Sequence, residues 1–330
     1  MRIPPTRGTR ARLAFVVALL FVATTPRLVG GQQNGGALDL LLPIGARATA
    51  LGSAFVAEQG SEAVWWNPAG LSRMSKPELS LDHFETIFLK GDAVALIMPL
   101  RGIGTVGLSA RLFNYGEQEQ RDSSGRQTGT LLTRTVSVGA TFSAPFGPNV
   151  DGGISFRLYR GGTDCVGRCT TNAFTTSYVD AGLQYRPFPA RPLRLGIAIR
   201  NLGPSVQVVD DPQADALLAR VHVGASYDPA FSGVPPDVRT RATIEIVASP
   251  KLQSPELRFG VQVGYTTSQS GVFARAGYVH NFDANAASTG PSAGIGLSQG
   301  RVQLDLTRIF ETFSTGLGVA PTYISIRVGL

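Results

Sequence analysis

The chain has 330 residues, a net charge of +7, 39 glycines and 16% charged residues, where soluble proteins usually have about 25%. Residues 1–31 contain five arginines and no acidic residue, so the remainder carries 25 basic and 23 acidic residues and a net charge of only +2. This balance excludes a nucleic-acid-binding protein, because such proteins present a clustered basic face.

The first segment has the organisation of a secretory signal peptide. Four arginines precede an apolar run of eleven residues at 13–23, and small and polar residues fill 24–31. This order is typical of exported proteins. The run is shorter than the roughly 20 apolar residues of a helical membrane span, so we predict that residues 1–31 are cleaved off after export.

The segment 32–76 does not show the alternation of a strand. Residues 45–58 are rich in alanine and place Ala48, Leu51 and Phe55 along one side of a short helix. About 45 residues are too few for a separate domain of ordinary size. The segment therefore has to pack against whatever follows it.

The same segment contains both tryptophans of the chain. Trp65 and Trp66 are followed directly by Asn67 and Pro68, a dipeptide that marks a turn. Two adjacent indole rings are too apolar to be left in water without a reason.

From residue 78 onwards, apolar and polar residues alternate. At 324–330, for example, Ile324, Ile326 and Val328 alternate with Ser325 and Arg327, which is the period-two pattern of a strand with one apolar face. Most segments of this kind have 8–12 residues, and a tilted membrane strand needs about 9–11. There are fourteen of them, at 78–86, 91–100, 104–115, 130–143, 152–160, 175–186, 192–201, 217–228, 238–248, 256–266, 271–280, 291–298, 301–310 and 322–330.

The connections between these segments alternate in length. Those after odd-numbered segments are long, at 116–129, 161–174, 202–216, 281–290 and 311–321. Those after even-numbered segments are mostly short, at 101–103, 188–190, 267–270 and 299–300. Short turns on one rim and long loops on the other are typical of membrane barrels. We therefore predict an all-β fold, a transmembrane antiparallel β-barrel of about 14 strands in the bacterial outer membrane, in contact with its lipid and with both chain ends on the periplasmic side.

The barrel at 77–330 would enclose the polar face of the strands. Segment 32–76, containing the short helix, would then enter the lumen as a hatch and plug its periplasmic end, with Trp65, Trp66, Asn67 and Pro68 as anchors. The indole N–H groups would find polar partners in the charged lumen.

Charged residues on the polar face should point into the lumen. The arrangement favours either a weakly anion-selective passage or an interior whose ion pairs are only structural, and both readings stay open. The predicted lumenal residues are Arg111, Arg157, Arg194, Arg200, Arg220, Arg241, Arg258, Arg275 and Arg327, with the acids Asp82, Asp180, Glu245 and Asp305.

The two cysteines, Cys165 and Cys169, lie in one predicted outer loop. A zinc site would need nearby histidines, and none is close in the sequence. In an oxidising compartment a disulfide is the expected state.

No catalytic or cofactor site is predicted. Residues 102–107 match a glycine-rich nucleotide-binding pattern, but a strand follows where a helix is needed. Residues 290–294 match a hydrolase nucleophile pattern, but all three histidines lie upstream. We therefore expect no enzyme, no cofactor and no metal.

Residues 45–71, GARATALGSAFVAEQGSEAVWWNPAGL, resemble the N-terminal signature of the PorV/PorQ family of outer-membrane proteins. The core of this motif, ending in Asn-Pro-Ala-Gly, also resembles the hatch of the FadL-type fatty acid transporters, which have fourteen strands. Residues 193–204, LRLGIAIRNLGP, resemble a recurring strand and turn of the PorV/PorQ group. The chain departs from the usual pattern at its last residue, which is Leu330 where outer-membrane strands commonly end in an aromatic residue.

The resemblance implies two functions. A PorV/PorQ-like protein would be an accessory or scaffold of outer-membrane protein export, with secretion-system proteins as partners. A FadL-like protein would pass small hydrophobic molecules across the membrane. An apolar pocket beneath the hatch would favour the second function, and a capped polar lumen with long structured outer loops would favour the first. The sequence indicates neither a substrate nor an oligomeric state.

Overall fold

The computed structural model describes residues 35–188, 192–207, 214–249, 254–282, 289–310 and 320–330. The predicted signal peptide lies outside these ranges, so its cleavage stays a prediction. No helix in the described part of the chain is long and apolar enough to cross a membrane.

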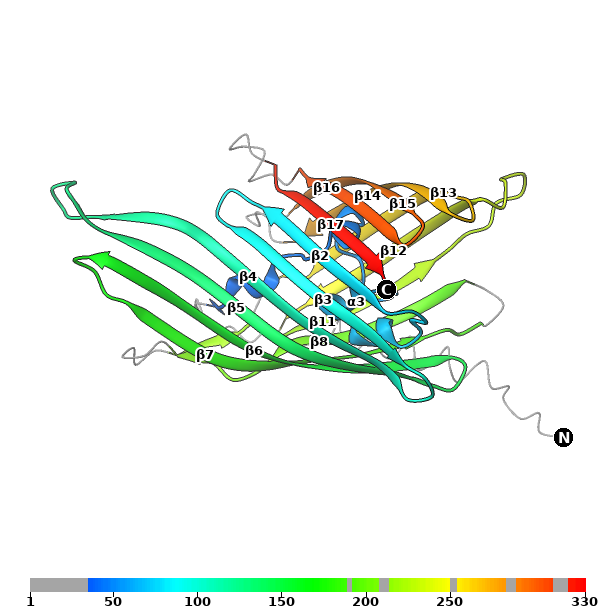
Figure 1. Ribbon diagram of the computed structural model, residues 1–330, viewed down its shortest axis with the longest axis horizontal. Helices are drawn as coiled ribbons and strands as arrows, with labels where there is room; N and C mark the ends of the chain where they lie inside the picture. The colour runs from blue at the N-terminus through cyan, green and yellow to red at the C-terminus, as the bar shows by residue number, and fades with distance from the viewer. Residues whose placement is uncertain (1–34, 189–191, 208–213, 250–253, 283–288, 311–319) are drawn as a thin grey trace. The chain divides into compact units, whose positions relative to one another are not determined.

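Fourteen antiparallel strands form a closed barrel, as predicted (Figure 1). Each strand pairs with its neighbour in the chain, and the last strand closes the barrel against the first, with Ile324 opposite His83 and Ile326 opposite Leu81. The strands are β2 (Glu78–Glu85), β3 (Lys90–Leu100), β4 (Gly104–Arg121), β5 (Gln127–Phe146), β6 (Val150–Gly167), β7 (Asn172–Tyr185), β8 (Leu193–Leu202), β11 (Arg220–Tyr227), β12 (Val238–Ala248), β13 (Glu256–Thr266), β14 (Ser270–Asn281), β15 (Gly290–Gln299), β16 (Val302–Ile309) and β17 (Thr322–Gly329).

The alternation of the sequence sets which side chains face outward. On β13, Phe259, Val261 and Val263 are exposed on the exterior, whereas Arg258 and Gln262 are buried inside. An apolar exterior around a closed ladder is the arrangement that a bilayer requires, because lipid cannot satisfy an open strand edge. The protein therefore has the architecture of a bacterial outer-membrane barrel.

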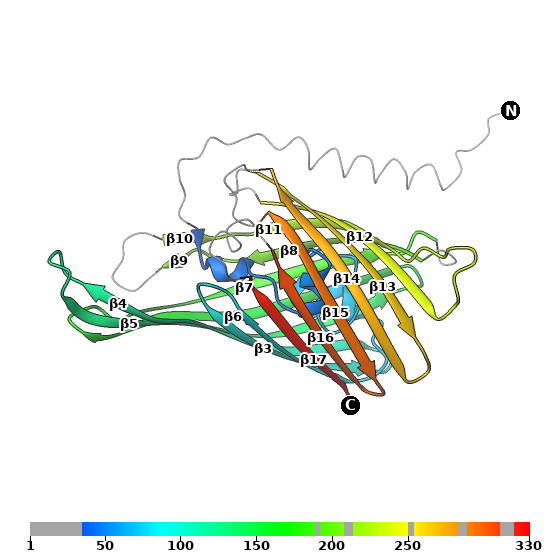
Figure 2. The ribbon, with the colours of Figure 1, turned by 90° about the horizontal axis from the view of Figure 1, so that it is seen from above.

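Two segments that were predicted to be long loops are mostly strand. Most of 116–129 and of 161–174 continues the strands, so β4 pairs with β5 as far as Arg121 with Gln127, and β5 with β6 as far as Gly129 with Gly167. Strand β3 pairs with β4 only to Asn114, so the four strands β4 to β7 run on beyond their neighbours (Figure 2). Outside the membrane, the ladder can continue without an apolar face, so the hydropathy pattern ends before the strand does.

The hatch lies inside the barrel (Figure 1). It consists of short helical turns, η1 (Leu38–Leu41), α2 (Ala46–Ala50), α3 (Ala63–Trp66) and η2 (Pro68–Leu71), joined by tight bends. Contacts with strands on all sides of the wall bury most of its side chains.

The entry of the hatch differs from the prediction that both ends lie on the periplasmic side. The first described strand, β1 (Gly35–Gly36), pairs in parallel with β10 (Ala214–Leu217). Strand β10 also pairs with β9 (Val206–Gln207), and both belong to the connection between β8 and β11 on the rim of the longer loops. The described chain therefore begins near the outer rim and passes through the lumen before it reaches β2 on the opposite rim.

Candidate functional site: the plugged lumen

Asn67 organises the hatch turn that the sequence singled out. Its side-chain oxygen accepts a hydrogen bond from the Ala69 backbone N–H (3.1 Å), and Pro68 occupies the first position of the following turn. Its amide nitrogen donates to the Val56 carbonyl (2.6 Å) and, over longer distances, to two wall carbonyls, those of Leu183 (3.3 Å) and Ile197 (3.5 Å). One amide therefore ties the hatch to β7 and to β8.

The tryptophans are buried in the hatch, but their polar contacts differ from the prediction. The Trp66 indole N–H donates to the Ile44 carbonyl (2.9 Å), which belongs to the hatch itself, and the Trp65 N–H has no partner within the described chain. The lumen contributes cations over the rings instead. The Arg157 guanidinium lies 4.9 Å from the Trp65 ring centre and that of Arg200 lies 5.0 Å from the Trp66 ring centre, within the range of cation–π attraction.

Inward-facing glycines let the hatch backbone approach the wall. A methyl group added at Gly182 would lie 2.0 Å from the Asn67 side-chain oxygen, and one added at Gly277 would lie 1.9 Å from the Gly52 nitrogen. The glycines that the sequence places on the polar strand face are therefore contact points for the plug. Others of this kind are Gly153, Gly196, Gly224, Gly260 and Gly294.

Ion pairs hold the hatch at its periplasmic half. Glu58 is fully buried and contacts Arg241 (2.7 Å), Arg194 (3.9 Å) and Arg47. Burial alone would raise the pKa of Glu58, but the three guanidinium groups and a hydrogen bond from Ser226 outweigh it and lower the pKa below the usual 4.5. Glu58 is therefore a charged group of the plug that is neutralised by the wall.

A second buried carboxylate, that of Glu245, belongs to the wall and binds the plug. Glu245 of β12 accepts hydrogen bonds from the Phe55 and Val56 backbone N–H groups (2.8 and 2.7 Å). It also contacts His222 (2.7 Å) and Arg258 (3.5 Å). We call the ring of contacts made by Glu58 and Glu245 and their partners the polar girdle.

The remaining predicted lumenal charges do face inward. Asp305 bridges Arg275 and Arg327, Asp180 binds Arg157, and Arg220 contacts Glu256, a residue that the prediction had not included. These ion pairs favour the reading of a structural, salt-bridged interior. Arg111 and Arg200 differ, because neither has an ion pair within the described residues; Arg111 donates to the Tyr178 hydroxyl (2.7 Å).

Towards the outer rim, the inward face changes from polar to aromatic. Phe84, Phe113 and Tyr323 are buried against one another, with ring centres 5.1 Å apart for Phe84 and Tyr323 and 5.4 Å for Phe84 and Phe113. Further along the same wall, Tyr159 of β6 and Tyr178 of β7 pack around Leu40 of the hatch. We call these five aromatic residues the aromatic mouth.

The aromatic mouth was not predicted, although the sequence contains a signal for it. In β2 the inward positions read Ser80, Asp82 and Phe84, so an aromatic residue occupies the polar face near the outer end of the strand. Phe113 and Tyr323 occupy equivalent positions on β4 and β17. An aromatic residue that interrupts the polar face of a barrel strand indicates that the lining of the lumen changes there from polar to apolar.

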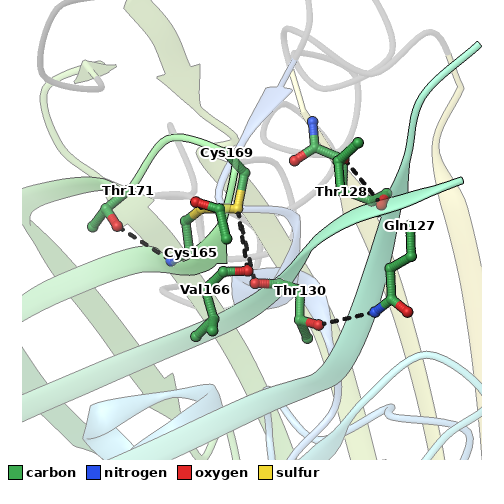
Figure 3. The surroundings of a disulfide bond; sticks show 9 residues. Gln127, Thr128, Thr130, Cys165, Val166, Cys169 and Thr171 are labelled. Atoms are coloured by element: carbon green, nitrogen blue, oxygen red, sulfur yellow. Dashed lines mark hydrogen bonds between the residues drawn. A yellow bond between two sulfur atoms is a disulfide. The ribbon is translucent and has the colours of Figure 1, made fainter.

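Cys165 and Cys169 form a disulfide in the structure, with Cα atoms 5.6 Å apart (Figure 3). The pair closes the end of β6 next to Thr130 of β5. The prediction placed the pair in an outer loop, whereas Cys165 belongs to β6 and the disulfide lies at the tip of the extended strands. The serine of the pattern at 290–294 lies within β15, so the helix that a nucleophile turn needs does not follow it.

Comparison with known proteins identifies the architecture. No family model matches the sequence, and no curated protein matches it. Among solved structures, the toluene transporter TodX of Pseudomonas putida has a TM-score of 0.57 at 13% identity, with 87% of this chain and 98% of that chain covered. The toluene transporter TbuX of Ralstonia pickettii has a TM-score of 0.55 at 14% identity, with the same two coverages. A FadL homologue of Pseudomonas aeruginosa has a TM-score of 0.53 at 11% identity and coverages of 87% and 99%.

At these identities the likeness shows the fold alone. The chain shares the closed-barrel fold of these outer-membrane proteins. The PorV/PorQ part of the resemblance has no support in these comparisons.

Proposed function

We propose that the protein passes small hydrophobic molecules across the bacterial outer membrane, with the hatch as its gate. The observation that carries this proposal is the aromatic mouth. Buried aromatic side chains collect near the outer ends of β2, β4 and β17, whereas the ion pairs of the polar girdle lie on β8 and on β11 to β13. The hatch and neighbouring rings bury these side chains in the described structure. Movement of the hatch would expose them as an apolar lining, and a hydrophobic solute that covers this lining gains about 25 cal/mol per Å² of buried apolar area.

The test is uptake of toluene by cells that produce the mature protein. Wild-type cells should accumulate labelled toluene several times faster than cells that carry a Phe84→Gln variant, because the amide makes the mouth polar. The outward-facing variant Ala276→Leu on β14 serves as the control for expression and folding. Equal uptake by wild type, Phe84→Gln and empty cells would refute transport through this lumen.

One observation favours the accessory role in protein export as a second candidate. The strands β4 to β7 extend beyond the apolar belt and present charged side chains, such as Glu117, Glu119 and Arg134, to water. A scaffold would bind its partner there. Crosslinking from Gln118 in native membranes should then capture a specific outer-membrane or cell-surface protein, and toluene uptake should not depend on Phe84.

A further inference from the structure

Two arginines lie close together on the outside of the barrel, on the neighbouring strands β5 and β6. Arg134 of β5 faces Gly162 of β6, and Arg160 of β6 faces Val136 of β5. The two arginines are therefore diagonal neighbours, and side chains in this relation on one face of a sheet are about 7–8 Å apart. The side chain of Gly162 is a single hydrogen atom, so it leaves the space beside Arg134 open.

Both arginines belong to the lipid-facing side of the wall. On β5, Arg134 and Val136 are exposed and Thr135 between them is buried. On β6, Leu158 and Arg160 are exposed and the residue between them is buried in the same way. Since side chains alternate between the two faces of a strand, each arginine continues an outward row of apolar residues.

Arg134 and Arg160 occupy the first outward positions beyond the apolar belt. On β5, the outward residues from 136 to 146 are all valine, alanine or phenylalanine, a length that suits the about 9–11 residues of a tilted membrane strand. On β6, the outward residues from 154 to 158 are also apolar. The arginines lie towards the rim of the longer loops, which is the exterior side of a membrane barrel. They are therefore at the level of the headgroups of the outer leaflet.

The wall itself does not neutralise these two charges. Within the described part of the chain, neither guanidinium has an ion pair or a side-chain hydrogen bond. The exposed charges near the outer ends of β2 and β3 differ, because they contact one another: His83 with Asp92 (2.8 Å) and Lys90 with Glu85 (2.9 Å). Two like charges on neighbouring positions of a sheet repel each other, so the arginine pair favours an anion from outside the chain.

Polar neighbours on both sides add hydrogen-bond donors to the pair. Asn114 of β4 lies opposite Arg134, and Thr175 of β7 lies opposite Arg160. Both side chains are exposed, and an amide and a hydroxyl can each donate a hydrogen bond. Four adjacent strands thus present donors to the membrane boundary (Figure 1).

The acids of this region lie farther from the membrane. Glu117 of β4 and Asp164 of β6 both lie opposite Leu132, which is two residues beyond Arg134 on β5. At about 3.3 Å per residue, they lie roughly 7 Å closer to the tip of the strands. An anion that rests on the apolar belt therefore meets the arginines before it meets the acids.

We propose that Arg134 and Arg160 bind a phosphate group of lipid A, the phosphorylated glycolipid of the outer leaflet, with Asn114 and Thr175 as flanking donors. The planar fork of arginine binds phosphate through two parallel hydrogen bonds, and the spacing of the pair lets both forks reach one phosphate. The acyl chains then cover the apolar outward positions next to the pair. Strands β4 to β7 leave the membrane here (Figure 2), so the glycolipid supports the base of their extension. The inference is independent of the proposed transport function.

Native mass spectrometry of the mature protein, incubated with lipid A in mild detergent, tests the site. Wild type should retain lipid A. The double variant Arg134→Gln/Arg160→Gln should retain about one tenth as much, because it loses the charge-assisted hydrogen bonds to the phosphate. Arg308→Gln is the matched control, since it removes an exposed outward arginine near the outer end of β16, and it should retain lipid A as the wild type does. Heat-modifiable gel mobility verifies that every variant is folded.

Four results would overturn the proposal. Unchanged retention in the double variant would exclude the two arginines, and an equal loss in Arg308→Gln would mean that lipid A responds only to the total charge. Equal retention of dephosphorylated lipid A by the wild type would exclude the phosphate contact. Equal retention of phosphatidylglycerol would assign the arginines to anionic lipids in general and not to the glycolipid.

Discussion

The polar girdle and the aromatic mouth occupy the same lumen and differ in what they contribute. In the girdle, each carboxylate of the plug or wall meets a donor on the other side, as Glu58 does with Arg241 and Glu245 with the Phe55 N–H. In the mouth, Phe84 packs against Phe113 and Tyr323 within one apolar cluster that also includes hatch side chains. Directional contacts fix the plug in one position, whereas non-directional apolar contacts can exchange one apolar partner for another. In the proposed function, the girdle holds the gate and the mouth receives the solute.

The contrast between the girdle and the mouth depends on which strand residues face the lumen and which face the lipid. The largest predicted effect on barrel stability tests this assignment. Val261 lies at the centre of β13 and faces the membrane. Val261→Arg should destabilise the barrel in lipid vesicles by about 2–4 kcal/mol, because a charge then lies at the bilayer midplane. The urea midpoint by circular dichroism measures this loss. Val261→Leu should be nearly neutral; a harmless arginine at 261 together with a barrel destroyed by Arg258→Val would mean that the register is inverted.

Within the lumen, removing the charge of Glu58 should loosen the girdle alone. Glu58→Gln leaves its arginine partners without a buried counter-charge, a loss of about 3 kcal/mol. Both tryptophans lie in the hatch, so tryptophan fluorescence during a urea titration reports hatch release. The release midpoint should fall in Glu58→Gln and stay unchanged in Asp122→Asn, which alters a partly exposed acid at the β4–β5 turn, far from the hatch in sequence.

The stabilisation that the Glu58 charge gives the hatch should depend on pH. The folded pKa of Glu58 is lower than its ordinary value of 4.5, so its contribution is fully present above about pH 4.5 and is lost as the pH falls through the lowered pKa. The difference in midpoint between wild type and Glu58→Gln should therefore be constant from pH 8 to pH 5 and shrink in stronger acid. A difference that grows on acidification would contradict the account of the girdle.

A smaller decrease in the urea midpoint of hatch release should come from a side chain that fills the space between wall and plug. Gly182→Val would place a side chain where the Asn67 oxygen lies, and overpacking of this kind costs about 1–3 kcal/mol. Hatch release should again occur at lower urea concentration. Ala181→Val, the outward neighbour on the same strand, is the control, and equal midpoints for the two variants would show that the hatch does not press on the wall at this point.

The smallest effect should come from the disulfide, which lies outside both regions. Serine at positions 165 and 169 should leave the release midpoint and toluene uptake unchanged, because the pair joins only the end of β6 to the residues directly after it. Mass spectrometry after alkylation without reductant should find no free thiol in the wild type. Two alkylated cysteines in freshly isolated membranes would disprove the bond.

The alternation of residues predicted the number of strands and their faces because a bilayer accepts only apolar side chains on the outside. It did not predict the outer ends of β4 and β5, where Glu117 and Gln118 pair across to Leu132 and Leu131 without facing lipid. Nor did it predict the path of the hatch, since β1 consists of two glycines and carries no pattern.

For the site, the residue types were predictable and their partners were not. Trp66 and Asn67 were recognised as anchors from their apolar and turn-forming character. That Asn67 donates to carbonyls of β7 and β8 depends on the close approach allowed by Gly182, which is a tertiary property. The aromatic mouth was missed because Phe84 and Tyr323 were read as ordinary strand residues.

Planar-bilayer conductance tests most directly the central claim that the hatch closes the lumen. The mature chain should show little or no conductance. Deleting residues 32–70 should open a channel that modestly prefers anions, because the arginines of the wall lose Glu58 and the wall carries nine predicted lumenal arginines against four acids. A mature chain that already conducts like an open porin, with the same conductance after the deletion, would contradict the account.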